Sequence, residues 1–309
     1  MSACRRAGTR ARMKLKPLAE QVIVVFGASS GIGRTTARLA AEGGARVVAA
    51  GRDEVALASL AGKLSQDRIA IGTADAANFS EVARIADLAI ERFGRIDTWA
   101  HIAGIGEWAR FLDMTPDEFE RIVDVDLLGP VWGAMAALRH MRTSGGAYIV
   151  VSSETARRAF PLMTAYSAAK HGVDGFVEAL RVELGHDRIP VSVTQIMPGT
   201  ISTPFFEHAR SRLGVRGSGP PPAYAPERVA AAILDAAQHP RRDVIVGSAA
   251  RLQLALQKIS PRLVDLMTRT NTWFRAEQSS EAKQPGDDAL FEPPHGDTRE
   301  RGPVTTLHR

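Results

Sequence analysis

Short runs of apolar, often β-branched residues alternate with longer amphipathic stretches from Gln21 onward. This alternation is typical of βαβ units, in which helices cover both faces of a parallel sheet. The predicted strands are Val22–Phe26, Arg46–Ala50, Ile69–Thr73, Ile96–His101, Ala147–Ser152, Val191–Ile196 and Asp243–Val246. The predicted helices run from Ile32 to Glu42, Asp53 to Leu64, Ser80 to Phe93, Pro116 to Met141, Ala165 to Leu184 and Pro226 to Gln238. We expect one α/β domain with a doubly wound parallel sheet of about seven strands.

Changes in composition divide the chain into four parts. These are a basic leader (1–16), the alternating body (17–248), a helical extension (249–274) and a polar tail (275–309). The tail has one aromatic residue beside seven acidic and five basic residues, so we expect it to be disordered. The amphipathic extension predicts an extra helix pair, packed on the body or at a subunit contact. A helix lying on a membrane surface is the alternative.

The excess of positive charge belongs to the leader. The chain has 39 Lys and Arg against 34 Asp and Glu, and without the leader's six basic residues it has 33 against 34. This distribution argues against a nucleic-acid partner. The leader lacks an apolar stretch, so it is no secretory signal. It is a targeting arm, a solvated tail, or an overlong translation start with Met13 as the initiator, and we favour the last.

The single cysteine, Cys4, cannot form an intramolecular disulfide, so we expect a reducing, cytoplasmic location. No Cys and His cluster has the spacing of zinc ligands, and we expect no metal site. No apolar run approaches the ~18 residues that span a bilayer. Residues 205–225 include the Gly/Pro-rich run from Gly214 to Pro222, for which we expect a mobile loop beside a site.

A glycine-rich turn follows the first predicted strand and precedes a helix. It comprises Gly27, Ser29, Ser30, Gly31, Ile32 and Gly33. Glycines let the backbone approach a pyrophosphate, and the helix N-terminus offers free N–H groups and a positive dipole end. The position between strand and helix therefore favours a dinucleotide site over a plain tight turn.

The end of the second strand indicates which coenzyme binds. A free ribose 2′-hydroxyl is normally held by a carboxylate at this point, whereas a 2′-phosphate needs a cation with planar donors. Gly51 stands in the acid's place and Arg52 follows it, so we predict NADP(H) in preference to NAD(H). Asp53 would repel the phosphate, and we interpret it as the N-cap of the next helix.

Tyr166, Lys170 and Ser153 form a candidate catalytic group. Tyr166 and Lys170 are four residues apart on a predicted helix and share one face. A neighbouring ammonium favours the phenolate, and lowering the tyrosine pKa by ~2–3 units corresponds to about 3–4 kcal/mol. Ser153 lies thirteen residues before Tyr166, at a predicted strand end, and supplies a hydroxyl. Tyr166 is therefore a candidate acid/base near neutral pH.

With the spacing G-x-x-x-G-x-G upstream, the chain from about Gln21 to Val246 resembles the short-chain dehydrogenase/reductase family. The resemblance implies a Rossmann-type fold and an oxidoreductase that interconverts a secondary alcohol and a ketone or aldehyde. The resemblance also implies a role for each catalytic residue. Tyr166 exchanges a proton with the carbinol oxygen and Ser153 hydrogen-bonds that oxygen, while Lys170 adjusts the pKa of Tyr166 and binds the nicotinamide ribose. Further coenzyme contacts are implied for Asp75, Ala103, Gly104, Pro198, Gly199, Ile201 and Thr203.

Four positions depart from the family pattern. Phe26 stands where a threonine usually precedes the glycines, and His101 with Ile102 replaces two asparagines. We interpret His101 as a satisfied structural group in preference to a proton relay. Asp126 aligns with the family's catalytic asparagine. A carboxylate there would hold Lys170 charged and blunt its effect on Tyr166, so we expect activity to survive at a modest level.

The loops after the strands offer mostly apolar residues for the substrate, among them Trp108, Phe160 and Phe205. We therefore expect a small, fairly hydrophobic alcohol or carbonyl compound, with Glu107 and Glu154 facing solvent. The resemblance implies a homodimer or homotetramer. One alternative function is a coenzyme-binding regulator or scaffold with weak or no turnover, and another is a peripheral membrane enzyme.

Overall fold

A seven-stranded, wholly parallel sheet forms the centre of the computed structural model, which describes residues 14–283 and 286–303. Its spatial order is β10 (Asp243–Val246), β7 (Val191–Pro198), β6 (Gly146–Val151), β4 (Thr98–His101), β1 (Val22–Phe26), β2 (Arg46–Gly51) and β3 (Ile69–Thr73). All seven predicted strands are confirmed. The leader up to Met13, with Cys4, lies outside the described residues.

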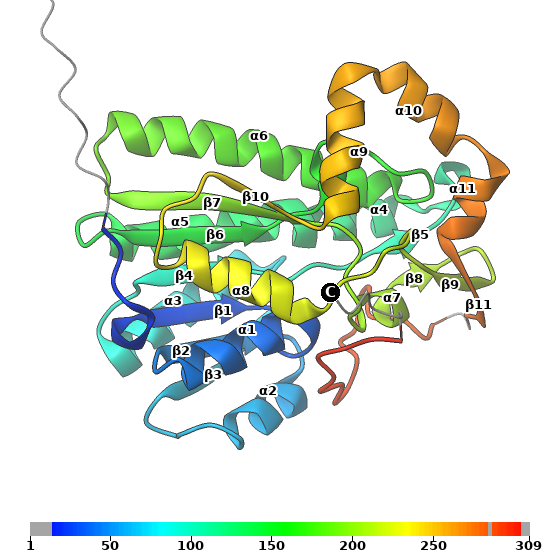
Figure 1. The fold of residues 1–309 in the computed structure, drawn as a ribbon. Helices are drawn as coiled ribbons and strands as arrows, with labels where there is room; N and C mark the ends of the chain where they lie inside the picture. Colours follow the sequence, from blue (N-terminus) through cyan, green and yellow to red (C-terminus); the bar gives the residue numbers. More distant parts are fainter. Residues whose placement is uncertain (1–13, 284–285, 304–309) are drawn as a thin grey trace, which may run out of the picture.

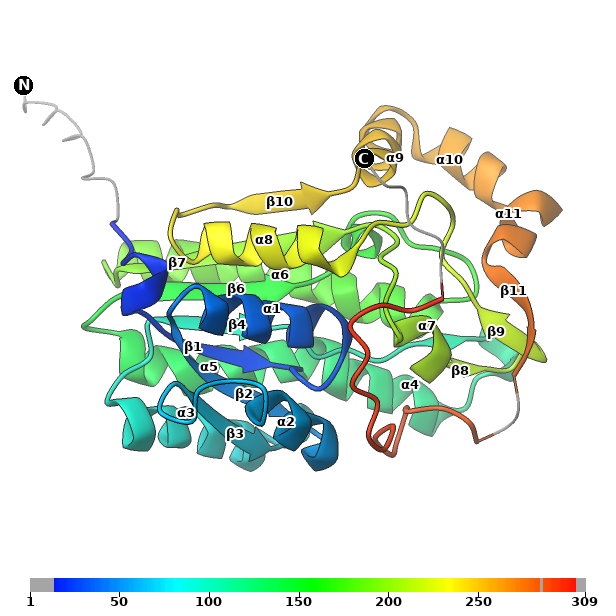
Figure 2. The same ribbon diagram turned by 60° about the horizontal axis from the view of Figure 1, so that its bottom comes forward.

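Helices cover both faces of the sheet (Figures 1 and 2). One face is covered by α1 (Gly31–Glu42), α2 (Glu54–Ala61) and α8 (Pro226–Ala236). The other is covered by α3 (Phe79–Phe93), α4 (Pro116–Val123), α5 (Gly129–Met141) and α6 (Thr164–His186). The predicted α/β fold with a Rossmann-type sheet is therefore confirmed.

Alternating residues of β1 explain why the sheet needs both layers. Val24 and Phe26 belong to the core beneath α3, α5 and α6, whereas Ile23 and Val25 belong to the core beneath α1 and α2. Successive side chains of a strand point to opposite faces, so an all-apolar strand requires cover on both sides. Each fully buried side chain of this size contributes about 1.5–3 kcal/mol of hydrophobic stabilisation.

The strand order places the ligand-binding edge of the sheet. Chain order reverses between β1 and β4, which is the switch point where doubly wound sheets bind ligands beyond the carboxyl ends of their strands. The glycine turn follows β1, Arg52 follows β2 and Ser153 follows β6. Parallel strands thus bring sequence-distant groups to one edge.

The long helix predicted from Pro116 to Met141 is broken in the structure. A π-helical turn, Asp124–Leu128, separates α4 from α5. Pro130 lacks the N–H that would donate to the carbonyl of Asp126 four residues earlier, and its ring crowds that carbonyl. The widened turn follows from this proline and carries Asp126.

Residues 205–225 contain short elements where we expected a mobile loop. They are α7 (Phe205–His208), β8 (Arg210–Ser211) and β9 (Val215–Gly217). Strand β8 pairs with β5 (Glu107–Trp108), and β9 pairs with β11 (Gln278–Ala282). These pairings tie the segment to the body and to the C-terminal part.

The extension consists of α9 (Ser248–Ile259), α10 (Pro261–Thr268) and α11 (Asn271–Ala276), drawn in orange in Figure 1. It packs on the body through Leu254 and Val264, which are buried. Arg158 donates hydrogen bonds to Asp265 and Thr268 of α10, both at 2.7 Å. In the part of the chain that the structure describes, no helix is long and apolar enough to cross a membrane.

The described part of the tail differs from the disordered tail that we expected. Residues 286–303, called the strap below, return to the ligand-binding edge beside the N-terminus of α1 (red in Figure 2). The strap is held by polar contacts between its acidic residues and arginines of the body, as in the pair of Arg210 and Asp288 at 3.0 Å, and by Leu290, which is fully buried in the main apolar core. Low apolar content does not prevent order where charged partners are in place.

Candidate active site

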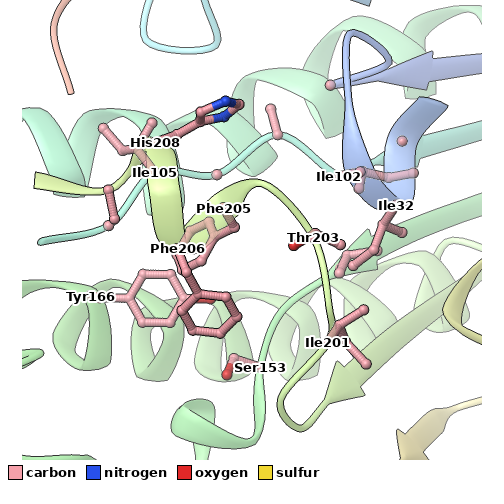
Figure 3. A pocket seen from close by; sticks show the side chains of 18 of the residues that line it. Ile32, Ile102, Ile105, Ser153, Tyr166, Ile201, Thr203, Phe205, Phe206 and His208 are labelled. Carbon is pink, nitrogen blue, oxygen red and sulfur yellow. The ribbon is translucent and has the colours of Figure 1, made fainter. Parts of the chain in front are cut away.

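A cavity of about 260 Å³ opens at the carboxyl ends of the strands and collects almost every predicted site residue. Tyr166, Ser153 and Phe205 lie toward one end, and Ile32 and Ile102 lie at the other (Figure 3). The predicted residues that line it are Gly27, Ser29, Ser30, Gly31, Ile32, Gly33, Arg52, Asp75, Ala103, Gly104, Trp108, Ser153, Phe160, Tyr166, Lys170, Pro198, Gly199, Ile201, Thr203 and Phe205. Asp126 lies behind the lining, against Lys170.

The glycine turn is bare backbone for a steric reason. Gly27 has φ +100°, and a Cβ there would lie 2.5 Å from the backbone nitrogen of Ala103. A Cβ on Gly33 would lie 1.8 Å from the carbonyl oxygen of Gly27. The turn therefore keeps a concave backbone surface at the N-terminus of α1, which suits a phosphate group.

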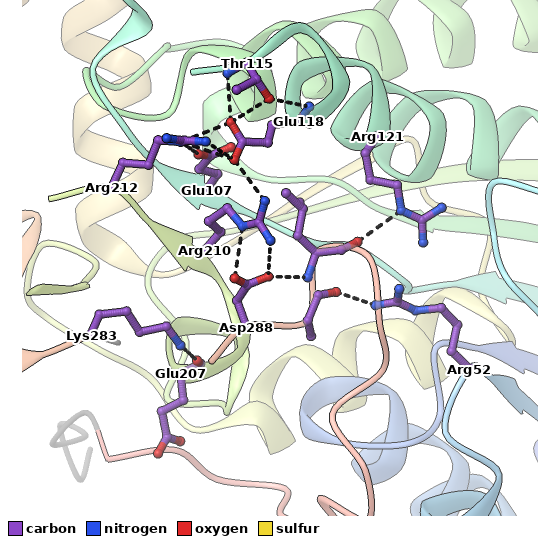
Figure 4. Close-up of polar contacts among 12 residues, drawn as sticks. Arg52, Glu107, Thr115, Glu118, Arg121, Glu207, Arg210, Arg212, Lys283 and Asp288 are labelled. Atoms are coloured by element: carbon purple, nitrogen blue, oxygen red, sulfur yellow. Dashed lines mark hydrogen bonds and ion pairs between the residues drawn. The ribbon is translucent and has the colours of Figure 1, made fainter. Parts of the chain in front are cut away.

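Arg52 presents its guanidinium at the end of β2 (Figure 4). A Cβ on Gly51 would lie 2.9 Å from Oγ of Ser29, so a larger residue at this position would require the Ser29 side chain to rotate. Asp53 accepts a hydrogen bond from the amide of Ala56 at 2.9 Å, which confirms that it is the N-cap of α2. One oxygen of the Asp53 carboxylate thus caps the N-terminus of α2.

Ser153 and Tyr166 lie together in the cavity (Figure 3). Oγ of Ser153 accepts a hydrogen bond from the amide of Thr155 at 3.1 Å, which fixes the side chain at the end of β6. Ser153 also hydrogen-bonds with Tyr166. The ring of Phe205 packs against that of Tyr166, with centroids 5.9 Å apart. The two hydroxyls can therefore act on one atom.

Lys170 and Asp126 form a buried ion pair with 2.8 Å between Nζ and Oδ1. Their side chains are 3% and 0% exposed. Burial alone would lower the pKa of Lys170, but the Asp126 carboxylate raises it above its ordinary value. The second Asp126 oxygen accepts a hydrogen bond from the amide of Ile105 at 3.0 Å. The ion pair with Asp126 thus favours the protonated form of Lys170.

The pKa of Tyr166 differs in direction from our expectation. Burial raises it, the Lys170 ammonium opposes that rise, and the Asp126 carboxylate adds to it. The ammonium lies 5.3 Å from the centre of the tyrosine ring. In this state of the molecule the tyrosine is a protonated hydroxyl, suited to donating a proton.

Comparisons with known proteins place this geometry in a family. Residues 21–214 match the short chain dehydrogenase family. The chain belongs to the short-chain dehydrogenase/reductase family. This short-chain dehydrogenase/reductase is 43% identical over 267 residues to an uncharacterized oxidoreductase, YxnA, of Bacillus subtilis, with 83% of this chain and 73% of the relative covered. It is 32% identical over 257 residues to dehydrogenase/reductase SDR family member 7B of Bos taurus, with 78% of each covered.

Solved structures of the same fold include proteins with either coenzyme. An alcohol dehydrogenase of the archaeon Thermococcus sibiricus, complexed with 5-hydroxy-NADP, superposes with a TM-score of 0.65 at 24% identity, covering 74% of this chain and 97% of that one. A short-chain dehydrogenase/reductase of Burkholderia phymatum in complex with NAD superposes with a TM-score of 0.72 at 22% identity, covering 81% of this chain and 97% of that one. These structures show the fold of NAD(P)-binding proteins, and membership of the family makes the chain an oxidoreductase.

Two buried acids correct the expectation that Glu107 and Glu154 face solvent. Both are almost fully buried, at 1% and 5% exposure. Burial raises the pKa of each to about 7. Glu154 lines the cavity next to Ser153, whereas Glu107 packs behind Trp108 near Arg212, 3.5 Å away. These carboxyl groups belong to the interior of this short-chain dehydrogenase/reductase.

His101 is a structural residue but not a satisfied one. Its ring is fully buried and stacks on Phe26, with centroids 5.0 Å apart. Neither ring nitrogen has a hydrogen-bond partner among residues that the structure describes. Burial, and then the charge of Lys170, lower its pKa to about 3. A relay needs a hydrogen-bond partner on each ring nitrogen, and the described residues provide none for His101.

Two candidate functional residues, Arg121 and Glu277, were not predicted from the sequence. Arg121 of α4 pairs with Asp75 at 2.6 Å and adds a second guanidinium beside Arg52 (Figure 4). Glu277 follows α11, lines the cavity and accepts a hydrogen bond from the indole of Trp273. No local motif marks Arg121, which reaches the site from a helix face. Glu277 lies in a stretch whose composition predicted no structure.

Proposed function

We propose that this oxidoreductase uses NADP(H) to interconvert a secondary alcohol and a ketone or aldehyde of a fairly hydrophobic substrate. The observation that carries the proposal is the meeting of Ser153, Tyr166 and Lys170 in the same cavity as the glycine turn and Arg52. A nicotinamide coenzyme, when bound, supplies the hydride donor or acceptor. The protein then has to hold it, orient the substrate and move one proton.

The chain's own groups fit such a coenzyme. The bare turn around Gly27 and the first amides of α1 suit the pyrophosphate. Arg52 and Arg121 offer guanidinium groups for a 2′-phosphate, and this supports NADP(H) over NAD(H). The backbone of Ala103 and Gly104 and the Asp75 side chain border the adenosine end. Pro198, Gly199, Ile201 and Thr203 border the nicotinamide end.

The proton moves through the hydroxyl of Tyr166. In the reductive direction Tyr166 donates its proton to the carbonyl oxygen, while Ser153 hydrogen-bonds that oxygen and stabilises its developing charge. In the oxidative direction the phenolate accepts the alcohol proton. The Lys170 ammonium stabilises the phenolate, and the ion pair with Asp126 limits how far it does so. We therefore expect a modest turnover.

The substrate end of the cavity is aromatic, with two buried acids. Trp108 and Phe205 pack edge to face, with centroids 6.0 Å apart, and Phe160 packs on Trp273 of the extension at 5.8 Å. These rings favour an apolar substrate. Glu154 and Glu277 add carboxyl groups that can bind a hydroxyl of the substrate away from its reacting carbon.

The first test separates coenzyme binding from catalysis. NADPH and NADH are titrated separately against the full chain, and coenzyme fluorescence reports binding. We expect NADPH to bind more tightly, Arg52→Ala to weaken NADPH by about 10- to 100-fold, and Tyr166→Phe to bind it normally. Tyr166→Phe should abolish turnover in a screen of hydrophobic ketones. A preference for NADH would contradict the role given to Arg52.

A second candidate function is a coenzyme-binding regulator with weak or no turnover. The buried pair of Lys170 and Asp126 and the raised pKa of Tyr166 favour it, because both work against a phenolate. NADPH binding with no turnover on any ketone, aldehyde or alcohol, and with equal behaviour of wild type and Tyr166→Phe, would support this function.

We also propose a cytoplasmic homo-oligomer. Met135 on α5 and Val182 on α6 are large apolar side chains left 54% and 71% exposed. Self-association would cover them. Light scattering of the purified chain gives its mass directly.

A further inference from the structure

The strap binds the two groups that the proposed coenzyme site needs for its phosphates. The amide of Gly31 at the start of α1 donates a hydrogen bond to the carbonyl oxygen of Arg299 at 2.9 Å. The guanidinium of Arg52 donates to the carbonyl oxygen of Ala289 at 2.6 Å (Figure 4) and to that of Phe291 at 2.9 Å. Peptide oxygens of the strap thus lie where phosphate oxygens would be recognised.

Neighbouring polar groups of the site are engaged in the same way. Nε of Arg121 donates to the carbonyl oxygen of Leu290 at 3.0 Å. The free oxygen of the Asp53 carboxylate accepts a hydrogen bond from the amide of Gly296 at 2.6 Å. Ala289 and the two prolines that follow, Pro293 and Pro294, line the cavity itself. The strap therefore covers the coenzyme end from Arg121 to the turn.

Contacts outside the cavity hold the strap in this place. Glu300 accepts hydrogen bonds from Arg38 at 2.8 Å and from Thr35 at 3.1 Å, on the outer side of α1. Asp288 pairs with Arg210 of β8. Gly302 and Ser202 exchange hydrogen bonds across the loop after β7. Leu290 of the strap is also fully buried in the main apolar core, and the Asp288 side chain is 5% exposed, whereas Glu300 pairs nearer the surface at 22%. Release of the strap therefore requires local opening of this apolar contact together with the ion pairs.

We propose that the strap is an autoinhibitory segment that competes with the coenzyme for Arg52 and Gly31, and that NADP(H) binding releases it. The proposal rests on the proposed function of the site. One N–H group donates one good hydrogen bond, so the amide of Gly31 serves either the strap or a phosphate. The apparent coenzyme affinity then equals the intrinsic affinity multiplied by the fraction of molecules in which the strap is open.

Amide hydrogen exchange on the full chain reports the strap directly and needs no turnover. The amides of Ala289, Gly296 and Gly302 donate hydrogen bonds to the body in the closed state. Saturating NADPH should speed their exchange by about tenfold or more, because displaced amides meet water. Unchanged or slower exchange in NADPH-bound protein would overturn the proposal, since it would describe a fixed wall or a lid that closes over the coenzyme.

Coenzyme affinity in a loosened strap gives the second readout. The double variant Asp288→Asn, Glu300→Gln weakens two anchors without changing any residue of the cavity, and should tighten NADPH by about 2- to 10-fold. Glu42→Gln is the matched control, because Glu42 also binds Arg38, at 3.1 Å, but touches no part of the strap. The control should bind NADPH like wild type. Equal affinity in the double variant and wild type would overturn the competition.

The same titrations separate this proposal from the proposed function. If NADPH binds to wild type but the strap amides do not exchange faster and the double variant gains no affinity, only the autoinhibitory role is overturned. Absence of NADPH binding in wild type together with binding in the double variant supports both. Absence of binding in every variant overturns the coenzyme site, and the strap's role with it.

Discussion

At the scale of single residues, Asp126 has the largest consequence for chemistry. The π-helical turn carries its carboxylate to 2.8 Å from Lys170, in an environment closed to water. The Lys170 ammonium therefore interacts with the Asp126 carboxylate as well as with the nearby Tyr166. An asparagine would keep the hydrogen bond to the amide of Ile105 and remove the negative charge.

We predict that Asp126→Asn preserves or raises turnover. Without the carboxylate, the pKa of Tyr166 falls and that of Lys170 falls, so the phenolate is reached at lower pH. The basic-side rise of oxidative kcat/KM against pH should move to lower pH by about one unit. Asp124→Asn, on the same turn, is the control and should leave the profile in place. Loss of turnover in Asp126→Asn would contradict this account.

At the scale of elements, the extension shapes one wall of the cavity. Helices α9 to α11 bring Trp273 onto Phe160 and place Glu277 in the lining. Arg158 ties α10 to the body, and its side chain is 9% exposed. Since a buried guanidinium with charged and hydroxyl partners is costly to remove, this one residue links the extension to the site.

Arg158→Ala should loosen the extension. Loss of the hydrogen bonds to Asp265 and Thr268 is expected to lower the free energy of unfolding by about 1–3 kcal/mol, measured by thermal and denaturant unfolding. Trypsin should also cut faster at Arg262 of α10 and at Arg269, which directly follows this helix. Arg251→Ala removes a more exposed arginine of the same extension and should change neither measurement. Equal stability of wild type and Arg158→Ala would show that apolar packing alone holds α10.

At the scale of the whole molecule, buried acids make stability depend on pH. Burial raises the pKa of Glu107 and Glu154 to about 7 and that of Glu277 to about 8, all from 4.5. Each group is more protonated in the folded than in the unfolded chain between its ordinary and its raised pKa. Their contribution is therefore fully present below about pH 4.5 and is lost as the pH rises through about 7–8.

We predict that the free energy of unfolding falls more steeply between about pH 5 and 8 in wild type than in Glu277→Gln. The difference in slope is at most about 1.4 kcal/mol per pH unit, which corresponds to one proton. Glutamine keeps an oxygen for the indole of Trp273 and does not titrate. Glu281→Gln, exposed on β11, should follow wild type. Parallel curves for wild type and Glu277→Gln would contradict a neutral buried Glu277.

The fold and most of the site were readable from the sequence because they depend on local patterns. Short apolar runs predicted every strand of the main sheet, and the spacing of the glycines after the first strand marked the turn at Gly27. The pairing of Tyr166 with Lys170 follows from helical spacing. Even the proximity of Asp126 to Lys170 could be predicted, although the proline-induced π turn that delivers it could not.

Tertiary structure alone decided what depends on partners distant in sequence. The strap has too few apolar residues to fold by itself. It becomes ordered because Arg38, Arg52 and Arg210, which are distant in sequence, donate hydrogen bonds to it, and because the body buries Leu290. Burial likewise set the protonation of Tyr166, Glu154 and Glu277, since a pKa depends on the dielectric and charges that the whole fold assembles around a group. Local sequence patterns thus specified the elements and the catalytic spacing, whereas long-range packing determined access to the site and its charge.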